Sequence, residues 1–191
     1  MGTTIYFTYN TGQYIHIPLS NSAGAAIVYS LVVAGSRYLL QLFDDLQSQN
    51  LDWSEIKWEI DLISHLATRD RCVLYNSEGF HLGQLGWTDE RFWEQKETFL
   101  RIIEMAMWKT MSEIESDFAP ERLLPNLGAV RLMLNNMVPD DIPENTDFEW
   151  WMEQPETIQF CPKHKVILHI EGCMVCHQRG LYSEDLMVVM K

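Results

Sequence analysis

The chain has 191 residues, of which 47% are hydrophobic and 12% aromatic, and this composition excludes a globally disordered protein. Its length is enough for one domain with a sizeable core, or for one domain with a small appendage. The formal net charge of -13 repels phosphate backbones at long range, so a general nucleic-acid binder is disfavoured unless the charge is segregated.

The first predicted element is a β-hairpin. Residues 4–9 and 13–19 alternate between apolar and polar side chains and flank the turn-forming sequence Asn10-Thr11-Gly12. This pattern is typical of two antiparallel strands joined by a three-residue loop. The N-terminal sequence MGTTIYFTYNTG also lacks the basic and then apolar pattern of a signal peptide.

A long, largely buried helix is predicted next, over residues 23–46, with an N-cap offered by residues 20–22. Part of this run approaches the length of a membrane span, but Arg37 and Gln41 interrupt it and no basic cluster flanks it. We therefore expect a soluble protein in an intracellular, reducing setting. Clustered cysteines in such a setting more often bind metal than form disulfides.

A second helix and a second hairpin follow. Asp52 and Glu55 have the spacing of a capping box at the start of a helix. The apolar face of that helix is Trp53, Ile56, Ile60, Ile63 and Ala67. Residues 71–75 and 80–85 bracket the turn-forming residues 76–79, a pattern that predicts another β-hairpin.

Two more helices are predicted after residue 87. Thr88 is expected to cap the longest helix of the chain, which runs to about residue 117 with a wide apolar face typical of a core helix. Pro125 suits the first turn of a shorter helix that ends near residue 134, and Pro139 prevents further extension. These elements predict an α+β main domain over residues 1–138, rich in helices and containing two β-hairpins.

Residues 139–157 are predicted to form an acidic linker between this domain and a C-terminal module at 158–191. No lysine or arginine lies between Arg131 and Lys163, whereas seven carboxylates fall within that interval. The linker also carries an aromatic cluster that includes Phe148, Trp150 and Trp151. Aromatic side chains surrounded by charge are typical of binding hot spots, although they could equally dock the linker onto the protein's own core.

The C-terminal module carries the clearest chemical signature in the chain. Cys161 and His164 are separated by two residues, and Cys173 and Cys176 have the same spacing eight residues further on. A two-residue gap lets a tight turn direct two side chains at one ion, and the intervening segment is long enough for a return strand. Two such pairs supply the closed tetrahedral set that zinc prefers in structural sites. We therefore predict a structural zinc site.

Residues 160–180 resemble the zinc ribbons and related zinc-knuckle modules, in which Cys-Pro-x-Cys or Cys-Pro-x-His is followed by a hairpin and Cys-x-x-Cys. The resemblance implies a zinc ion held by Cys161, His164, Cys173 and Cys176. The chain departs from the common ribbon in its histidine at the second position and in its short return strand.

Three alternatives concern the same segment. The sequence Cys173-Met-Val-Cys176-His177 also fits a c-type haem attachment motif, but haem attachment takes place in exported proteins and would leave Cys161 and His164 without a role. His177 is an alternative fourth ligand to His164, and His169 is expected on the strand face or beside the site. A catalytic zinc would need an open coordination position, which four protein ligands do not leave.

The sequence favours a non-enzymatic, intracellular interaction protein that docks on a macromolecular partner. Phe148, Trp150 and Trp151 are candidate contacts in the linker. Its acidic charge would suit a regulatory protein that imitates nucleic acid and blocks a basic cleft. The rival hypothesis is a nucleic-acid-binding subunit that acts through the zinc module. Its candidate phosphate contacts are Lys163, Lys165, His169 and Arg179.

Overall fold

The protein is represented by a computed structural model, which describes residues 3–8, 14–19, 21–49, 52–75, 80–113, 120–142, 158–168, 172–178 and 188–189. Its α-helices are α1 (Asn21–Gln49), α2 (Lys57–Tyr75), α3 (Phe92–Glu113), α4 (Pro120–Asn136) and α5 (Met174–Gln178). Its 3-10 helices are η1 (Trp53–Ile56), η2 (Leu82–Gln84) and η3 (Pro139–Asp141). Its strands are β1 (Thr3–Thr8), β2 (Tyr14–Leu19), β3 (Phe80–His81), β4 (Gln159–Phe160) and β5 (Val188–Val189).

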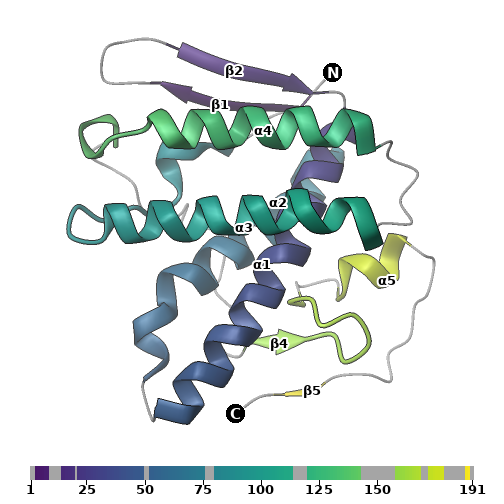
Figure 1. Cartoon of the computed structure of the whole chain (residues 1–191). Helices are drawn as coiled ribbons and strands as arrows, with labels where there is room; N and C mark the ends of the chain where they lie inside the picture. Colours follow the sequence, from purple (N-terminus) through teal and green to yellow (C-terminus); the bar gives the residue numbers. More distant parts are fainter. Residues whose placement is uncertain are drawn as a thin grey trace.

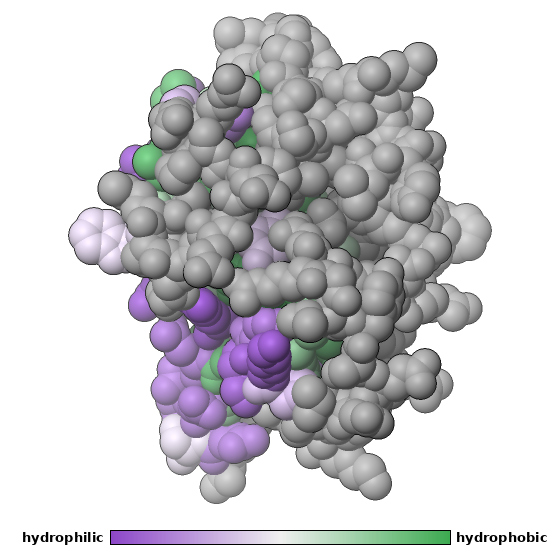
Figure 2. Space-filling view, turned by 90° about the vertical axis from the view of Figure 1, so that its right-hand side faces the viewer, coloured by the Kyte–Doolittle hydropathy of each residue, from purple (hydrophilic) through white to green (hydrophobic). Residues whose placement is uncertain are grey.

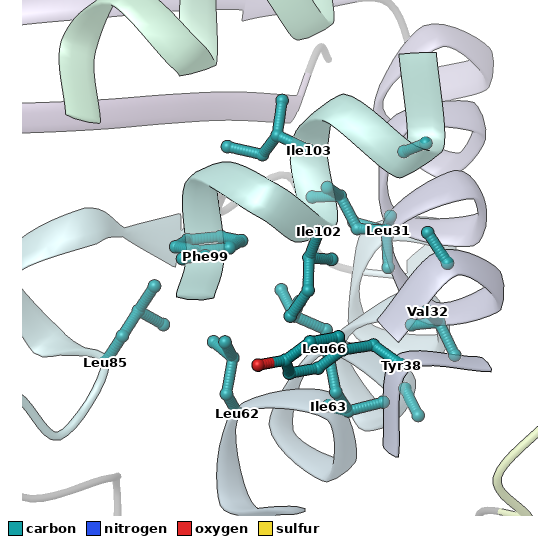
Figure 3. Packing of buried hydrophobic residues seen from close by; sticks show 14 of the residues in the cluster. Leu31, Val32, Tyr38, Leu62, Ile63, Leu66, Leu85, Phe99, Ile102 and Ile103 are labelled. Carbon is teal, nitrogen blue, oxygen red and sulfur yellow. The ribbon is translucent and has the colours of Figure 1, made fainter. Parts of the chain in front are cut away.

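Helix α1 is the central element of the core. In Figure 1, α3 and α4 lie side by side and α1 crosses both of them. Side chains of α1, α2 and α3 point toward one another in Figure 3, among them Leu31, Leu62, Leu66, Phe99 and Ile102, and all of these are fully buried. The stretch Ala26–Gln49 is long and apolar enough to cross a membrane, but the most apolar part of it is 67% buried inside the protein. The expectation of a buried helix here is therefore confirmed.

Gly35 lets α1 pack closely against α2. A Cβ atom at this position would lie 2.0 Å from Cδ1 and 2.8 Å from Cγ1 of Ile63, whose side chain is completely buried. Ile63 has no free volume into which it can move, because protein interiors are close-packed. The glycine is thus required by helix packing, although it lowers the intrinsic stability of the helix.

Gly35→Ala is expected to destabilise the protein by about 1 to 2 kcal/mol, because overpacking outweighs the gain in helix propensity. Gly128 in α4 is the matched control, since nothing lies within 4 Å of a Cβ added there. Gly128→Ala should therefore stabilise the protein by up to about 1 kcal/mol. Urea denaturation measures both changes. Adding Ile63→Val, which removes Cδ1, should rescue part of the Gly35→Ala loss, and a strictly additive double variant would contradict the proposed contact.

The first predicted hairpin is confirmed by strand pairing. Strands β1 and β2 pair antiparallel in a register that places Ile5 opposite Ile17, and both side chains are buried. The predicted turn at 10–12 lies outside the described residues. Strand β3 joins the other edge of β1 in parallel, giving a three-stranded sheet in the order β2-β1-β3.

The second predicted hairpin is wrong. Residues 71–75 form the last part of α2, while Phe80 and His81 pair with β1 and residues 82–84 form η2. A short apolar run is compatible with either a strand or a buried helix segment, and here the run continues an existing helix. The predicted strand partner of residues 80–81 is replaced by β1, which is distant in sequence.

Two helix boundaries also differ from the prediction. Helix α3 begins at Phe92 after a turn, and its 22 residues are fewer than the 29 of α1, so α1 is the longer helix. The amide of Thr88 donates to Oε1 of Gln95, at 2.9 Å, at the entrance to α3. Helix α4 begins at Pro120, so Pro125 lies inside it rather than in its first turn. Pro120 itself has the fixed φ that suits a first helical position.

A buried carboxylate joins α2 to the start of α3. The side chain of Glu59 is 5% exposed, and its Oε1 lies 3.7 Å from Nη2 of Arg91, while its Oε2 has no hydrogen-bond partner. Burial raises the pKa of Glu59, although its backbone hydrogen bond and Arg91 both oppose this shift. The pKa of the exposed Glu94 is instead lowered, because Arg91 donates to its carboxylate.

Because the pKa of Glu59 is raised and that of Glu94 is lowered, replacing each residue by glutamine is expected to change the stability of the protein in opposite directions. A raised pKa means that ionised Glu59 destabilises the folded state, so Glu59→Gln should raise the free energy of unfolding at pH 7 by up to about 1 kcal/mol. The gain should shrink as the pH falls toward about 4, where Glu59 is protonated. Glu94→Gln should cause a loss of less than about 1 kcal/mol at pH 7, and this loss should also disappear in acid. Urea denaturation between pH 4 and 7 would contradict this view if both variants shifted stability in the same direction.

Candidate metal centre

The first half of the candidate metal centre is a tight turn between two short extended segments. The amide of Cys161 donates to the carbonyl of Val166 and that of Lys165 donates to the carbonyl of Cys161, both at 2.8 Å. Phe160 forms a β-bridge with Ile167, and the amide of Leu168 donates to the carbonyl of Gln159. The chain therefore reverses over residues 161–166, as the predicted return strand requires.

Lys165 completes this turn in a left-handed backbone conformation, with φ of 56°. Such a conformation is uncommon for residues other than glycine, so the surrounding hydrogen bonds hold it in place. The turn directs the backbone amides of His164 and Lys163 at the sulfur of Cys161. Amides aimed at a sulfur stabilise its thiolate form, which is the form that binds metal.

The second half is the start of α5. Gly172 has φ of 99°, a value available mainly to glycine, and Cys173 follows it directly before the helix. The backbone amides of Cys176 and Val175 point at the sulfur of Cys173. The two pairs of residues therefore share one local design, in which a tight bend aims two side chains and two amides at the same point.

The four side chains converge. Nδ1 of His164 lies 3.6 Å from Sγ of Cys161, 3.6 Å from Sγ of Cys173 and 3.3 Å from Sγ of Cys176. The sulfurs of Cys161 and Cys176 are 3.9 Å apart, and all four potential ligand atoms lie within 4.8 Å of one another. The three cysteines form no disulfide. The arrangement is that of a metal site with three sulfur ligands and one nitrogen ligand.

Burial and hydrogen bonding shift the pKa values of the three cysteine thiols in different directions. Burial raises the pKa of Cys173 to about 12, and it also raises the pKa of Cys176. Burial acts in the same direction on Cys161, but the amides of His164 and Lys163 and the two neighbouring thiols lower its pKa overall. Three thiolates crowded into one partly buried volume repel one another, so a cation is needed to hold all three in the ionised form.

The cluster is packed directly against α1. The amide of Ile167 donates to Oγ of Ser36, at 3.0 Å, and Ser36 donates in turn to the carbonyl of Val32. The ring of Phe160 meets the ring of Phe43 edge-on, with 5.8 Å between the centroids. Val166, Ile167, Met174 and Val175 belong to the same buried cluster as the helices. The described part of the predicted C-terminal module therefore shares the core of the main domain.

The predicted partner contacts are placed only in part. Lys163 and Lys165 are exposed on the first turn. The lower part of the face in Figure 2, at the height of β4 in Figure 1, is mainly hydrophilic among its described residues. Phe148, Trp150, Trp151, His169 and Arg179 lie outside the described residues, as does the side chain of His177 in α5.

The first residues of the predicted linker form η3, which is anchored to the main domain. Asp141 is 7% exposed, and its Oδ2 accepts the amide of Val138 at 2.9 Å. The rest of the predicted linker, from residue 143 to 157, lies outside the described residues. Sequence reasoning did not single out Ser36 as the residue that ties α1 to the metal centre. The bond spans 131 positions in the chain, and a serine in a helix carries no signal for it.

Comparisons with protein families, with curated proteins and with solved structures gave no match to this chain. The inferences about its function therefore rest on the residues and geometry of the metal centre and on the surface of the fold.

Proposed function

We propose that this protein is a non-enzymatic, intracellular zinc-binding interaction protein. In this proposal a structural zinc ion, held by Cys161, His164, Cys173 and Cys176, folds the C-terminal segment against α1. The observation that carries it is the convergence of three sulfurs and one imidazole nitrogen within 4.8 Å of one another. A closed set of this kind is typical of structural zinc sites.

The distances between the ligand atoms support zinc as the metal. Zn–S bonds of about 2.3 Å and Zn–N bonds of about 2.0 Å in a tetrahedron imply S···S edges of about 3.8 Å and S···N edges of about 3.5 Å. The sulfurs of Cys161 and Cys176 are 3.9 Å apart, and the three S···N distances are 3.3 to 3.6 Å. A small divalent ion with four soft or borderline ligands fits this volume. Magnesium and calcium prefer oxygen ligands and larger coordination numbers.

The ligand set also supports a structural rather than a catalytic role. Catalytic zinc sites keep a position for water or substrate, and they hold the metal with three protein ligands. Here two tight bends supply four ligands, and apolar neighbours in the chain, Val166, Ile167, Met174 and Val175, belong to the protein core. The zinc would supply folding free energy to the C-terminal segment, since such sites rarely exist before the metal binds.

The charge of the chain suggests the kind of partner with which the protein interacts. A net charge of -13 attracts basic surfaces and repels nucleic acid at long range. A basic cleft of the kind found in enzymes that act on nucleic acids would be attracted to such a surface. The proposed role is therefore regulatory docking on a protein partner rather than turnover of a substrate.

A second candidate function is binding of nucleic acid through the metal centre. It is favoured by the exposure of Lys163 and Lys165, which lie on either side of the ligand His164. Fluorescence anisotropy with labelled single-stranded RNA and duplex DNA, over a range of salt concentrations, separates the two candidates. Phosphate binding would weaken steeply as salt rises, and Lys163→Ala with Lys165→Ala would reduce the salt dependence by about one ion for each lysine removed. The proposed interaction role predicts no saturable binding of either nucleic acid at physiological salt.

A further inference from the structure

An exposed tryptophan marks one end of the pair formed by α3 and α4. The side chain of Trp93, in the first turn of α3, is 61% exposed, and Val138, just after α4, is 43% exposed. Both residues lie in the described part of the chain. Large apolar side chains that remain exposed often mark interaction sites.

Lys96 links the start of α3, where Trp93 lies, to the end of α4, just before Val138. Its Nζ donates to the carbonyls of Met137 and Asn135, at 2.7 and 2.8 Å, and lies 5.2 Å from the centroid of the Trp93 ring. The Trp93 ring also meets the ring of the buried Phe92 edge-on at 5.1 Å. The tryptophan is thus fixed on one side while the rest of its surface faces solvent. A rigid aromatic side chain loses little conformational entropy when it binds a partner.

Negative charge surrounds the exposed tryptophan. Asp89 and Glu90, in the turn before α3, and Glu97, in its second turn, are all exposed, and helical spacing places Glu97, four residues after Trp93, on the side that carries Trp93. Asp140, two residues after Val138, is exposed as well. We call this set of residues, Trp93, Val138, Asp89, Glu90, Glu97 and Asp140, the acidic tryptophan face.

Three described cations lie close to these residues in the chain, and each has a contact elsewhere: Arg101, one turn after Glu97, lies over the ring of Tyr38. Arg91 already pairs with Glu94 and lies 3.7 Å from Glu59, and Lys96 is buried and bonded to the carbonyls at the end of α4. Among the described residues, the carboxylates of the acidic tryptophan face take part in none of the ion pairs, so they present negative charge around an apolar centre. A second copy of the chain would bring two such faces together and is disfavoured by repulsion, and nucleic acid is disfavoured for the same reason.

We propose that the acidic tryptophan face binds a lysine- or arginine-rich polypeptide segment that places one apolar side chain against Trp93 and Val138. The apolar contact supplies the anchor and the surrounding carboxylates supply charge complementarity. This inference rests on the proposed interaction role and adds the place and the chemistry of the partner. It assigns the contact to α3 and η3, and so to a surface separate from the metal centre.

Synthetic twelve-residue peptides test the proposal when titrated into the full-length protein by isothermal calorimetry. One peptide carries six lysines or arginines around a central leucine, a second replaces the leucine with serine, and a third replaces the basic residues with glutamate. The first peptide should bind with an affinity that falls as salt rises, and the other two should bind at least about tenfold more weakly. Trp93→Ala should weaken binding of the first peptide by at least about tenfold.

Two further variants make the test specific. Glu90→Gln with Glu97→Gln removes charge from exposed positions that make no core contact, and it should weaken binding without a change in stability. Trp108→Ala is the matched control, because Trp108 lies on the same helix and is 81% exposed but is not part of the acidic tryptophan face. Equal loss in the Trp108 and Trp93 variants would overturn the proposal, as would failure of the first peptide to bind. Zinc content measured on the same samples reports separately on the metal centre.

Discussion

Replacing Cys173 by serine is expected to remove the metal and to release the C-terminal segment from α1 while the helical core stays folded. Cys173 is 5% exposed and contributes one of the three sulfurs of the metal centre. Structural zinc binding is worth about 10 kcal/mol or more at neutral pH, and a site that lacks one thiolate loses much of that free energy. Zinc bound after dialysis should fall from about one ion per chain to well below half an ion.

Hydrogen exchange measures the structural part of this expectation. The amide of Ile167 donates to Ser36 of α1, and the amides of Cys161 and Leu168 donate to carbonyls within residues 158–168, so these bonds report on the fold of that segment and on its contact with α1. Their protection should be lost in the Cys173→Ser protein, whereas the amides of α3 should keep theirs. Cys72→Ser is the control, since Cys72 lies in the backbone of α2 and is not among the predicted ligands. Retention of zinc and of full protection in the Cys173 variant would contradict the assignment of Cys173 as a ligand.

Lys96→Met is expected to destabilise the protein by about 3 kcal/mol, because it leaves the end of α4 without hydrogen-bond donors. The carbonyls of Asn135 and Met137 lie at the C-terminus of α4, where helix carbonyls have no partner within the helix and carry partial negative charge. The ammonium group of Lys96 satisfies both of them. Its carbon chain is buried, so methionine replaces its volume but not its charge.

Lys57→Met is the matched control for this substitution. Lys57 forms an ion pair with the carboxylate of Asp61, but the side chain of Lys57 is 67% exposed. Exposed ion pairs of this kind contribute less than about 1 kcal/mol to stability. Urea denaturation at pH 7 should therefore show a large loss for the Lys96 variant and a small change for the Lys57 variant. Equal effects would show that the contacts of Lys96 with α4 do not stabilise the fold.

The candidate metal centre was the feature that could best be predicted from the sequence. The spacing of Cys161 with His164 and of Cys173 with Cys176 depends on local geometry alone, because each pair is aimed by one tight bend. The core helices could be predicted from the sequence for a similar reason. Their apolar residues recur at helical spacing, and Ile56, Ile60, Ile63 and Ala67 of the second predicted helix are all buried.

Features that depend on distant residues could not be predicted. Phe80 and His81 pair with β1, which lies more than seventy residues earlier in the chain, and no local pattern distinguishes that partner from residues 71–75. The bond between Ser36 and Ile167 and the exposure of Trp93 also depend on how the helices pack. Phe92, Phe99, Ile103 and Ala106 of α3 are buried, as their helical spacing predicts, whereas Trp93 was expected beside them on the apolar face and instead faces solvent.

The link between α1 and the metal centre has a consequence for stability. Phe43 and Ser36 belong to α1, and the C-terminal segment contacts Phe43 through the ring of Phe160 and Ser36 through the amide of Ile167. In the proposed function, zinc binding would therefore add to the stability of a helix that already packs against α2, α3 and α4. Removal of zinc is expected to expose that side of α1 to solvent.

X-ray absorption at the zinc edge tests the central claim most directly, using full-length protein purified without added metal. The account predicts about one zinc per chain with a first coordination shell of three sulfurs near 2.3 Å and one nitrogen near 2.0 Å. A protein that carries no zinc, or a zinc ion with an oxygen ligand in place of one of these four, would contradict it.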